Sequence, residues 1–268
     1  MPIFDSHIHA DTRGWEDLRM LSYLGVRGVV SCAHDVFDFS APPSLFDHYR
    51  RILDFDCMRL RMNQIQPFVA LGIHPSGIPH EGLEDVLARL PEFLAREPVV
   101  AVGEIGLQDG TDREIDVLLR QLQIGKALGK PCVVHTPQKN KAEVAKVVLE
   151  TVSQSGISKD LVVIDHVDSR IVEAVRDFGS WMALSVQPHK ISEREAANLV
   201  RSFGSHRVLL NSDLAAGMSD VLSLPKAIFE METLGIGRED IRRVSYTNAL
   251  EFYRIGSLPE AASVFHDA

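Results

Sequence analysis

The stretch 99-VVAVGEIGLQDGTDREIDVLLRQLQIGKALGKPCVVHT-136 indicates the fold, because two short apolar runs flank one long amphipathic segment. Apolar residues recur every three or four positions across 112–130, which is typical of a helix that buries one face. Gly129 and Pro131 mark the end of this helix and the start of the next strand. Strand, helix and strand in this order predict two parallel strands joined by a crossover helix.

The same alternation continues along the chain, and segment 139–156 is expected to form another such helix that ends at Gly156. The strand-like runs are 3–9, 27–34, 67–74, 99–107, 131–136, 161–167, 181–187 and 207–214. Eight such runs predict an α/β protein with a TIM-type (β/α)8 barrel, a single domain over 1–268 with extra C-terminal helices in 237–255. The alternative is an open doubly wound sheet, but neither a GxGxxG fingerprint nor a P-loop supports it.

Composition limits the partners that we expect. A formal net charge of −9 disfavours a broad basic surface for nucleic acid. No charged segment followed by an apolar one opens the chain, and no run approaches the roughly 18 apolar residues of a membrane helix. We therefore expect a cytoplasmic protein without a membrane partner. The scattered Cys32, Cys57 and Cys132 are expected to be reduced, with Cys32 and Cys132 in the core.

Ionisable side chains gather at the C-terminal ends of the predicted strands, the rim where barrel enzymes build their sites. In chain order they are His7, His9, His34, His74, Glu104, His135, His166, His189 and Asp213. His7 and His9 lie two residues apart in an extended run, so both side chains point to one face. Alone they would also fit a structural pair, but an unpaired buried carboxylate such as Glu104 is costly and predicts a binding partner.

Six of these side chains are predicted to bind divalent metal ions: His7, His9, Glu104, His135, His166 and Asp213. Imidazoles and carboxylates suit Zn²⁺, Mn²⁺ or Fe²⁺, whereas clustered cysteines are absent. Six ligands exceed the needs of one tetrahedral ion, which favours two ions about 3.5–4 Å apart with a bridging carboxylate. Such ions lower the pKa of a bound water and give a hydroxide nucleophile. Asp213 is expected to orient or deprotonate that water.

Other polar residues are expected in the wall of the site or at the protein surface. His34 and His74 fit either substrate contacts or hydrogen-bonded wall residues, and Asp5 is expected to orient a ligand histidine. Histidines outside the strand ends are expected at the surface, namely His48, His80, His206 and His266. The basic segments 48–55 and 58–62 are expected to form a solvated helix face.

The set of motifs resembles the TatD family of metal-dependent hydrolases, which belongs to the amidohydrolase-type barrels. The resemblance is carried by FDSHIHAD (4–11), GIHP (72–75), VGEIGL (102–107), PCVVHT (131–136), IDHV (164–167), NSDL (211–214) and TNALEFYRI (247–255). It implies that His7, His9, Glu104 and Asp213 bind one ion, and that Glu104 bridges to a second ion held by His135 and His166. Glu104 then replaces the carboxylated lysine of other barrels of this type. The resemblance also implies Mg²⁺- or other metal-dependent hydrolysis of phosphodiesters in DNA.

Three departures from the family pattern concern the loops expected to contact substrate. Pro137 stands two residues after His135, where the family usually has an arginine, so a natural phosphate clamp is missing. Gln108 follows Leu107 where the family typically has aspartate, and no proline follows closely after Asp213. The predicted metal ligands are unaffected by all three.

Three functions remain open on the sequence alone. The first is metal-dependent hydrolysis of a phosphoester, in a nucleic acid or a small molecule, which the bridging Glu104 and the family resemblance favour. The second is hydrolysis of an amide, ester or lactone in a small metabolite, which the acidic balance and the missing arginine favour. The third is a non-catalytic metal-binding scaffold, although a scaffold has no need for six converging ligands. The sequence does not indicate the oligomeric state.

Overall fold

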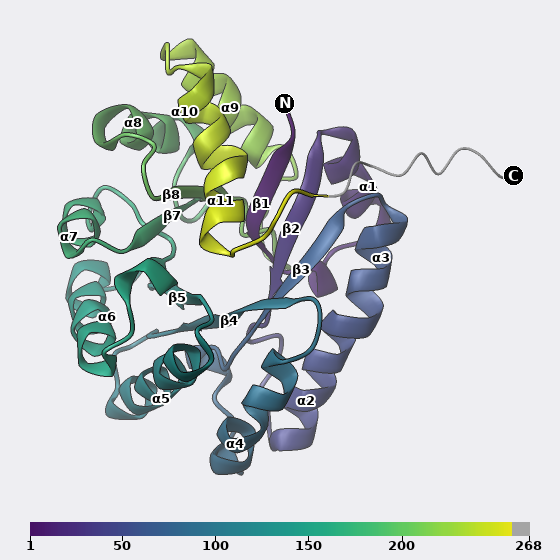
Figure 1. Ribbon diagram of the computed structural model, residues 1–268, viewed down its shortest axis with the longest axis vertical. Helices are drawn as coiled ribbons and strands as arrows, with labels where there is room; N and C mark the ends of the chain where they lie inside the picture. Colours follow the sequence, from purple (N-terminus) through teal and green to yellow (C-terminus); the bar gives the residue numbers. More distant parts are fainter. Residues whose placement is uncertain (259–268) are drawn as a thin grey trace, which may run out of the picture.

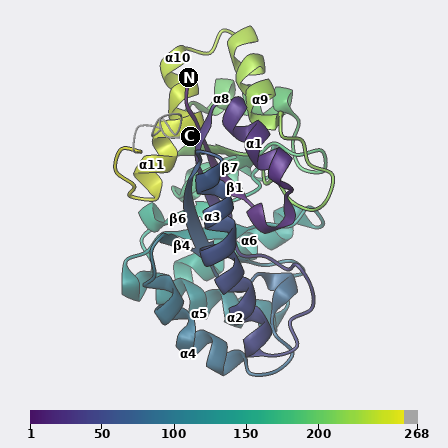
Figure 2. The ribbon, with the colours of Figure 1, turned by 90° about the vertical axis from the view of Figure 1, so that its right-hand side faces the viewer.

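The computed structural model describes residues 1–258 and shows a parallel eight-stranded barrel surrounded by helices (Figures 1 and 2). The strands are β1 (Ile3–Ile8), β2 (Val26–Cys32), β3 (Gln66–Leu71), β4 (Val99–Gly106), β5 (Cys132–His135), β6 (Val162–Ile164), β7 (Trp181–Ser185) and β8 (Val208–Asn211). They follow one another around the barrel in chain order. The barrel closes where Ile8 forms a parallel bridge with Leu214, just beyond β8. The predicted TIM-type barrel is confirmed.

Helices connect the strands and cover the outside of the barrel. They are α1 (Trp15–Tyr23), α2 (Pro42–Arg50), α3 (Cys57–Met62), α4 (Leu83–Leu94), α5 (Asp112–Leu128), α6 (Lys141–Ser155), α7 (Val172–Phe178), α8 (Glu193–Phe203), α9 (Ser223–Thr233), α10 (Arg238–Arg242) and α11 (Asn248–Phe252). Shorter helical segments are η1 (Ala10–Thr12), η2 (Arg51–Asp56), η3 (Pro75–Gly77), η4 (Lys159–Leu161) and η5 (Arg243–Thr247). Helices α10, η5 and α11 lie in the C-terminal segment where extra helices are predicted.

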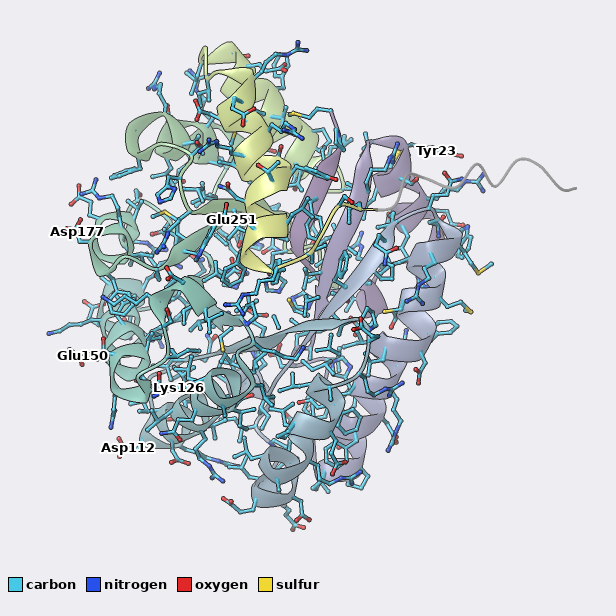
Figure 3. The ribbon with its side chains drawn as sticks, in the orientation of Figure 1. Tyr23, Asp112, Lys126, Glu150, Asp177 and Glu251 are labelled. Carbon is cyan, nitrogen blue, oxygen red and sulfur yellow. The ribbon has the colours of Figure 1, made fainter. Side chains whose placement is uncertain are left out.

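The helix ends and faces agree with the sequence pattern. Gly129 and Gly156 follow α5 and α6 with φ of 62° and 66°, a left-handed conformation that glycine adopts without steric cost. Polar residues such as Asp112, Glu150 and Asp177 lie on the outer surface (Figure 3). The inner faces pack on the strands and form the main apolar core with them. Among residues 1–258, no helix is both long and apolar enough to cross a membrane.

The N-terminal end of the barrel is filled by aromatic side chains and covered by α11, which lies across the strands in Figure 1. The Phe4 ring stacks on Phe68 and Tyr253, with centroids 5.9 and 6.5 Å apart. Phe252 packs against Trp181, and the Tyr253 hydroxyl donates a hydrogen bond to the carbonyl oxygen of Ser6 over 2.8 Å. This end of the barrel is therefore a packed apolar core.

A register shift in β1 changes which side chains of its C-terminal half face the interior of the barrel. Phe4 belongs to the interior cluster, and strict alternation would place the side chain of Ile8 on the same face. The pairing with β2 shifts between Asp5 and Ile8, and Ile8 instead packs in the outer core. His7 and His9 consequently both face the open end of the barrel.

The long helical segment of α2, η2 and α3 corrects two sequence-based expectations. His48 is only 5% exposed, not at the surface, because it shares the inner face of this segment with Leu45, Tyr49 and Ile52. Arg59 is likewise buried and pairs with Asp56 over 2.8 Å.

The remaining surface and core expectations agree with the structure. Arg50, Arg51 and Arg61 are exposed, as a solvated face requires, and so are His80 and His206. His266 lies outside the described residues. The three cysteines are buried free thiols.

Candidate metal centre

The six residues predicted to bind metal meet in one buried cluster at the open end of the barrel. They come from the ends of five different strands: His7 and His9 from β1, Glu104 from β4, His135 from β5, His166 after β6 and Asp213 after β8. The structure therefore brings together all six side chains that the strand-end pattern singled out.

The first half of the cluster joins His7, His9, Glu104 and Asp213. The Nε2 atoms of His7 and His9 lie 3.2 Å apart, and each lies 3.4–3.7 Å from Oε2 of Glu104. Oδ1 of Asp213 is 3.2 Å from His9 Nε2 and 3.7 Å from His7 Nε2. Four ligands at about 2.1 Å from one tetrahedral ion lie roughly 3.4 Å from one another. These separations suit a single cation between the four side chains.

The second half of the cluster uses the other oxygen of the same glutamate. Oε1 of Glu104 lies 2.9 Å from Nδ1 of His135 and 2.9 Å from Nε2 of His166. The two oxygens of Glu104 thus face two different pairs of imidazoles. This is the arrangement of a carboxylate that can bridge two cations.

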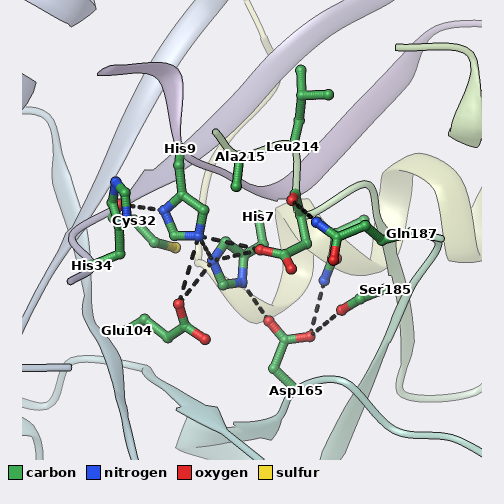
Figure 4. A network of polar contacts seen from close by, with 12 residues as sticks. His7, His9, Cys32, His34, Glu104, Asp165, Ser185, Gln187, Leu214 and Ala215 are labelled. Carbon is green, nitrogen blue, oxygen red and sulfur yellow. Dashed lines mark hydrogen bonds and ion pairs between the residues drawn. The ribbon is translucent and has the colours of Figure 1, made fainter. Parts of the chain in front are cut away.

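In the first half, hydrogen bonds fix which ring nitrogen carries the proton. His9 Nδ1 donates to the carbonyl oxygen of Cys32 over 3.0 Å. His7 Nδ1 donates to Oδ2 of Asp165 over 2.5 Å, and Figure 4 shows His7 between Asp165 and Glu104. Both Nε2 atoms therefore direct lone pairs at the cluster.

The second pair of imidazoles is held in the same way. His166 Nδ1 donates to Ser185 Oγ over 2.8 Å, and that hydroxyl donates to Asp165 Oδ1 over 2.9 Å. His135 Nε2 donates to Oε1 of Gln108 over 3.1 Å. Four imidazole lone pairs consequently face carboxylate oxygens. Because lone pairs and carboxylates repel each other unless a cation lies between them, the donor set fits bound metal.

The ionised state of Glu104 is a second reason to expect a cation in the cluster. Burial disfavours its ionised form, but the neighbouring imidazoles of His7, His135 and His166 hold its pKa well below the usual range. Glu104 is 2% exposed, so a buried carboxylate stays ionised at the centre of the cluster. Positive charge must compensate it there.

Asp165 connects the two halves and was not identified from the sequence. Besides His7 and Ser185, its carboxylate accepts hydrogen bonds from Asn211 Nδ2 over 3.0 Å and from the backbone N–H of His166 over 2.7 Å. Burial opposes its ionisation, but the neighbouring His166 and His7 lower its pKa. A carboxylate within the apolar run 161–167 was the signal that could have revealed it.

Unusual backbone conformations coincide with the cluster. His166 and Asp213 have φ of 59° and 44°, a region that costs a non-glycine residue about 1–3 kcal/mol. Gly106 has a φ of 150°, and a Cβ there would lie 2.4 Å from the carbonyl oxygen of His135. Glycine at this position therefore permits the close approach of β4 and β5 beside Glu104.

Asp5, which is predicted to orient a ligand histidine, contacts the backbone near the cluster, including that of His7. Its carboxylate accepts hydrogen bonds from Ser212 N and Oγ and, over 3.4 Å, from the backbone N–H of His7. Burial raises the pKa of Asp5 to about 6. Asp5 links β1 to the end of β8, and Asp165 holds the His7 ring instead.

His74 and His34 flank the cluster on two sides. His74 Nδ1 accepts a hydrogen bond from Ser76 N, and His74, Glu104 and His135 offer ligand atoms within 4.8 Å of one another. The His34 ring lies 4.1 Å from that of His9, and its Nε2 lies 3.1 Å from both oxygens of Asp11. Asp11, His34 and His48 form a further group of possible metal-binding side chains.

A cavity of about 280 Å³ opens above the cluster and gives it access to solvent. Its walls include five of the predicted rim histidines, three carboxylates, Gln187 and Lys190. Lys190 was not identified from the sequence, because a lysine in a loop carries no periodic signal. Its Nζ contacts Oδ2 of Asp213 and lies 3.0 Å from both ring nitrogens of His166.

The sequence matches a known family over almost its whole length. Residues 4–254 match the family model described as TatD related DNase. This chain belongs to the TatD family. The resemblance seen in the motifs is thereby confirmed, and the protein is a TatD-type metal-dependent hydrolase.

Relatives of this TatD protein include an archaeal homologue of nearly equal length. The metal-dependent hydrolase MJ0761 of Methanocaldococcus jannaschii is 35% identical over 254 residues, which cover 94% of this chain and 100% of the relative. Human deoxyribonuclease TATDN3 is 24% identical over 206 residues, 68% of this chain and 73% of that protein. The crystal structure of the TatD-like protein AF1765 from Archaeoglobus fulgidus superposes with a TM-score of 0.80 at 32% identity. That match covers 94% of this chain and 99% of the other.

Proposed function

We propose that this TatD-family hydrolase binds two divalent metal ions and cleaves phosphoester bonds. The observation that carries the proposal is the placement of Glu104, whose two oxygens face the imidazoles of His7 and His9 on one side and of His135 and His166 on the other. One ion would be held by His7, His9, Glu104 and Asp213, and the other by Glu104, His135 and His166. Neutral imidazoles and carboxylates are suited to Zn²⁺, Mn²⁺, Fe²⁺ or Mg²⁺.

Metal ions in this site would lower the pKa of a water molecule and draw electron density from a phosphoryl oxygen. The two carboxylate oxygens of Asp213 have different neighbours. Its Oδ1 faces His9, whereas its Oδ2 contacts Lys190 at the wall of the cavity. These contacts support a role for Asp213 in orienting the attacking water and accepting its proton, while Glu104 would hold the two metal ions together.

Charge balance supports a substrate with a negative charge. The cavity is lined by the carboxylates of Asp35, Glu104 and Asp213 and by the ammonium group of Lys190. Two divalent ions would exceed the remaining negative charge of these groups. A phosphoester, whose oxygens carry negative charge, compensates this excess better than a neutral ester or amide.

Hydrolysis of a neutral amide, ester or lactone is the second candidate, supported by the segment after His135. Thr136 is buried and donates its hydroxyl hydrogen bond to the carbonyl oxygen of Asp165, and the next residue is Pro137. Pro137 therefore cannot supply the cationic clamp that the arginine of the TatD pattern provides at this position.

The decisive experiment measures metal content and substrate preference together. Protein purified without added metal is analysed by elemental mass spectrometry, then loaded with Mn²⁺, Zn²⁺ or Mg²⁺. Each form is offered bis(p-nitrophenyl) phosphate, p-nitrophenyl acetate and a small lactone. We expect two metal ions per chain and metal-dependent turnover of the phosphodiester. Turnover of only the ester or lactone would favour the second candidate, and bound metal without any turnover would favour a scaffold.

Nucleic acid as the natural substrate can be tested separately. A protein that binds the DNA backbone through several cationic groups loses affinity steeply as salt concentration rises. We expect cleavage of single-stranded oligonucleotides with such a salt dependence if DNA is bound. A small phosphoester as substrate predicts turnover of the nitrophenyl compound that salt hardly changes.

A further inference from the structure

We propose that Lys190 binds the negatively charged phosphoryl group of the substrate. This inference rests on the proposed function, because it assigns the anion-binding group of the same site. It does not depend on which metal ion is bound.

The loop that carries Lys190 is fixed to the rim of the barrel. It spans 186–191 between β7 and α8, and its two ends are joined by a bridge between Val186 and Ile191. Within it, the backbone N–H of Lys190 donates to Gln187 O over 2.9 Å. Gln187 Nε2 in turn donates to the carbonyl oxygen of Asp213 over 2.7 Å. The loop therefore holds the side chain of Lys190 in one defined place.

That place is the wall of the cavity directly beside the proposed metal ligands. The side chain of Lys190 is 15% exposed, and its ammonium group contacts Asp213 Oδ2 and the His166 ring. If metal binds, the lone pair of His166 and the charge of Asp213 would be directed at the ion and would no longer be available to Lys190. The ammonium group would then be repelled by the ions, and an anionic oxygen in the cavity would become its best partner.

Lys190 also stands alone among the residues that line the cavity. Within residues 1–258, it is the only lysine or arginine in that lining, which otherwise includes Asp35, Glu104 and Asp213. Pro137 stands where the TatD pattern has an arginine, so this position supplies no cation to the substrate. An ammonium group with three donors suits a tetrahedral phosphoryl group as a point charge.

The test compares Lys190→Met, which removes the charge, with Lys190→Arg, which keeps it. Lys146→Met is the matched control, because Lys146 is 79% exposed on the outer helix α6. For each metal-loaded full-length variant, isothermal titration calorimetry measures the affinity for inorganic phosphate. Steady-state kinetics give kcat and KM for bis(p-nitrophenyl) phosphate and for p-nitrophenyl acetate, and elemental analysis gives metal content.

We expect Lys190→Met to weaken phosphate binding and raise KM for the phosphodiester about 10- to 100-fold, the loss of one charge-assisted hydrogen bond. Metal content and KM for the neutral ester should stay unchanged, and Lys190→Arg should restore part of the affinity. Unchanged phosphate affinity in Lys190→Met, or a loss of bound metal, would overturn the inference. Phosphate binding that needs Lys190 without turnover of the diester would leave the inference standing and refute the proposed function.

Discussion

The two ends of this barrel are built from the same strands but hold opposite kinds of side chains. At the N-terminal end, Phe4 of β1 packs on Phe68 and Tyr253 beneath α11. At the C-terminal end, the same strand presents His7 and His9 to a cluster of buried carboxylates. The closed end gains stability from apolar burial, whereas the open end holds like charges together. We infer that substitutions at the two ends separate stability from activity.

The largest effect is expected at the open end. Glu104→Gln keeps the shape of the side chain but removes the charge that faces both imidazole pairs. We expect kcat/KM for the phosphodiester to fall on the order of 10³-fold or more, equivalent to about 4 kcal/mol in the activation free energy. The melting temperature of the metal-free protein should not fall, because the buried charge disappears with the substitution.

Glu150→Gln, at an exposed position on α6, is the control for this change and should retain full activity. A Glu104→Gln protein that kept wild-type kcat/KM would remove Glu104 from the chemistry altogether.

The closed end should respond in the opposite sense. Phe252→Ala leaves a cavity between Trp181 and Tyr253, and we expect the free energy of unfolding to fall by about 3–5 kcal/mol. Metal content and kcat of the folded fraction should not change. Urea denaturation and activity assays below the transition measure both quantities. Phe229→Ala, at a side chain that is 65% exposed, should be neutral. A loss of metal in Phe252→Ala would show that the two ends are coupled.

The buried His48 of α2 should change how the stability of the protein depends on pH. Burial lowers the pKa of His48 to about 4, below the ordinary value of 6.5. The folded state therefore holds His48 neutral, and its contribution is present above pH 6.5 and lost as the pH falls toward 4. For one such group, the loss is at most about 3 kcal/mol.

Unfolding free energies of the wild type and of His48→Gln between pH 7 and 4 measure this contribution. The variant should lose less stability over that range, and His206→Gln, at an exposed histidine, should behave like the wild type. Parallel pH curves for all three proteins would contradict a buried neutral His48.

A smaller effect is expected at Asp165, which accepts a hydrogen bond from the ring of His7. Asp165→Asn keeps an acceptor for Ser185 or Asn211 but weakens the hold on the His7 ring. Loss of such a supporting group costs about 10–100-fold in metal affinity or activity. Competition with a fluorescent chelator measures the metal affinity. Asp177→Asn, exposed on α7, is the control, and equal affinities for both variants would place Asp165 outside the metal-binding network.

The strand ends made most of the open end predictable from sequence. His7, His9, Glu104 and Asp213 stand at the ends of apolar runs, and a closed parallel barrel brings such ends to one rim. Local sequence therefore sufficed to bring these four side chains together, because the barrel geometry supplied the long-range contacts.

The omissions came from contacts that no local pattern contains, whereas the error at His48 overlooked a helical pattern in the sequence. His48 was expected at the surface because it lies outside the strand ends, but the helical spacing with Leu45, Tyr49 and Ile52 buries it. Lys190 reaches the cluster only because Gln187 ties its loop to the end of β8. The ring partner of His7 is Asp165, 158 positions away in the sequence, where Asp5 was the local candidate.

A crystal structure of the protein grown with Mn²⁺, with diffraction recorded at the manganese absorption edge, tests the central claim most directly. We expect two anomalous peaks about 3.5–4 Å apart, with one oxygen of Glu104 bound to each. His7 and His9 should contact the first ion, and His135 and His166 the second. A single peak, or a Glu104 carboxylate bound to only one ion while the other imidazole pair stays empty, would contradict the two-metal centre.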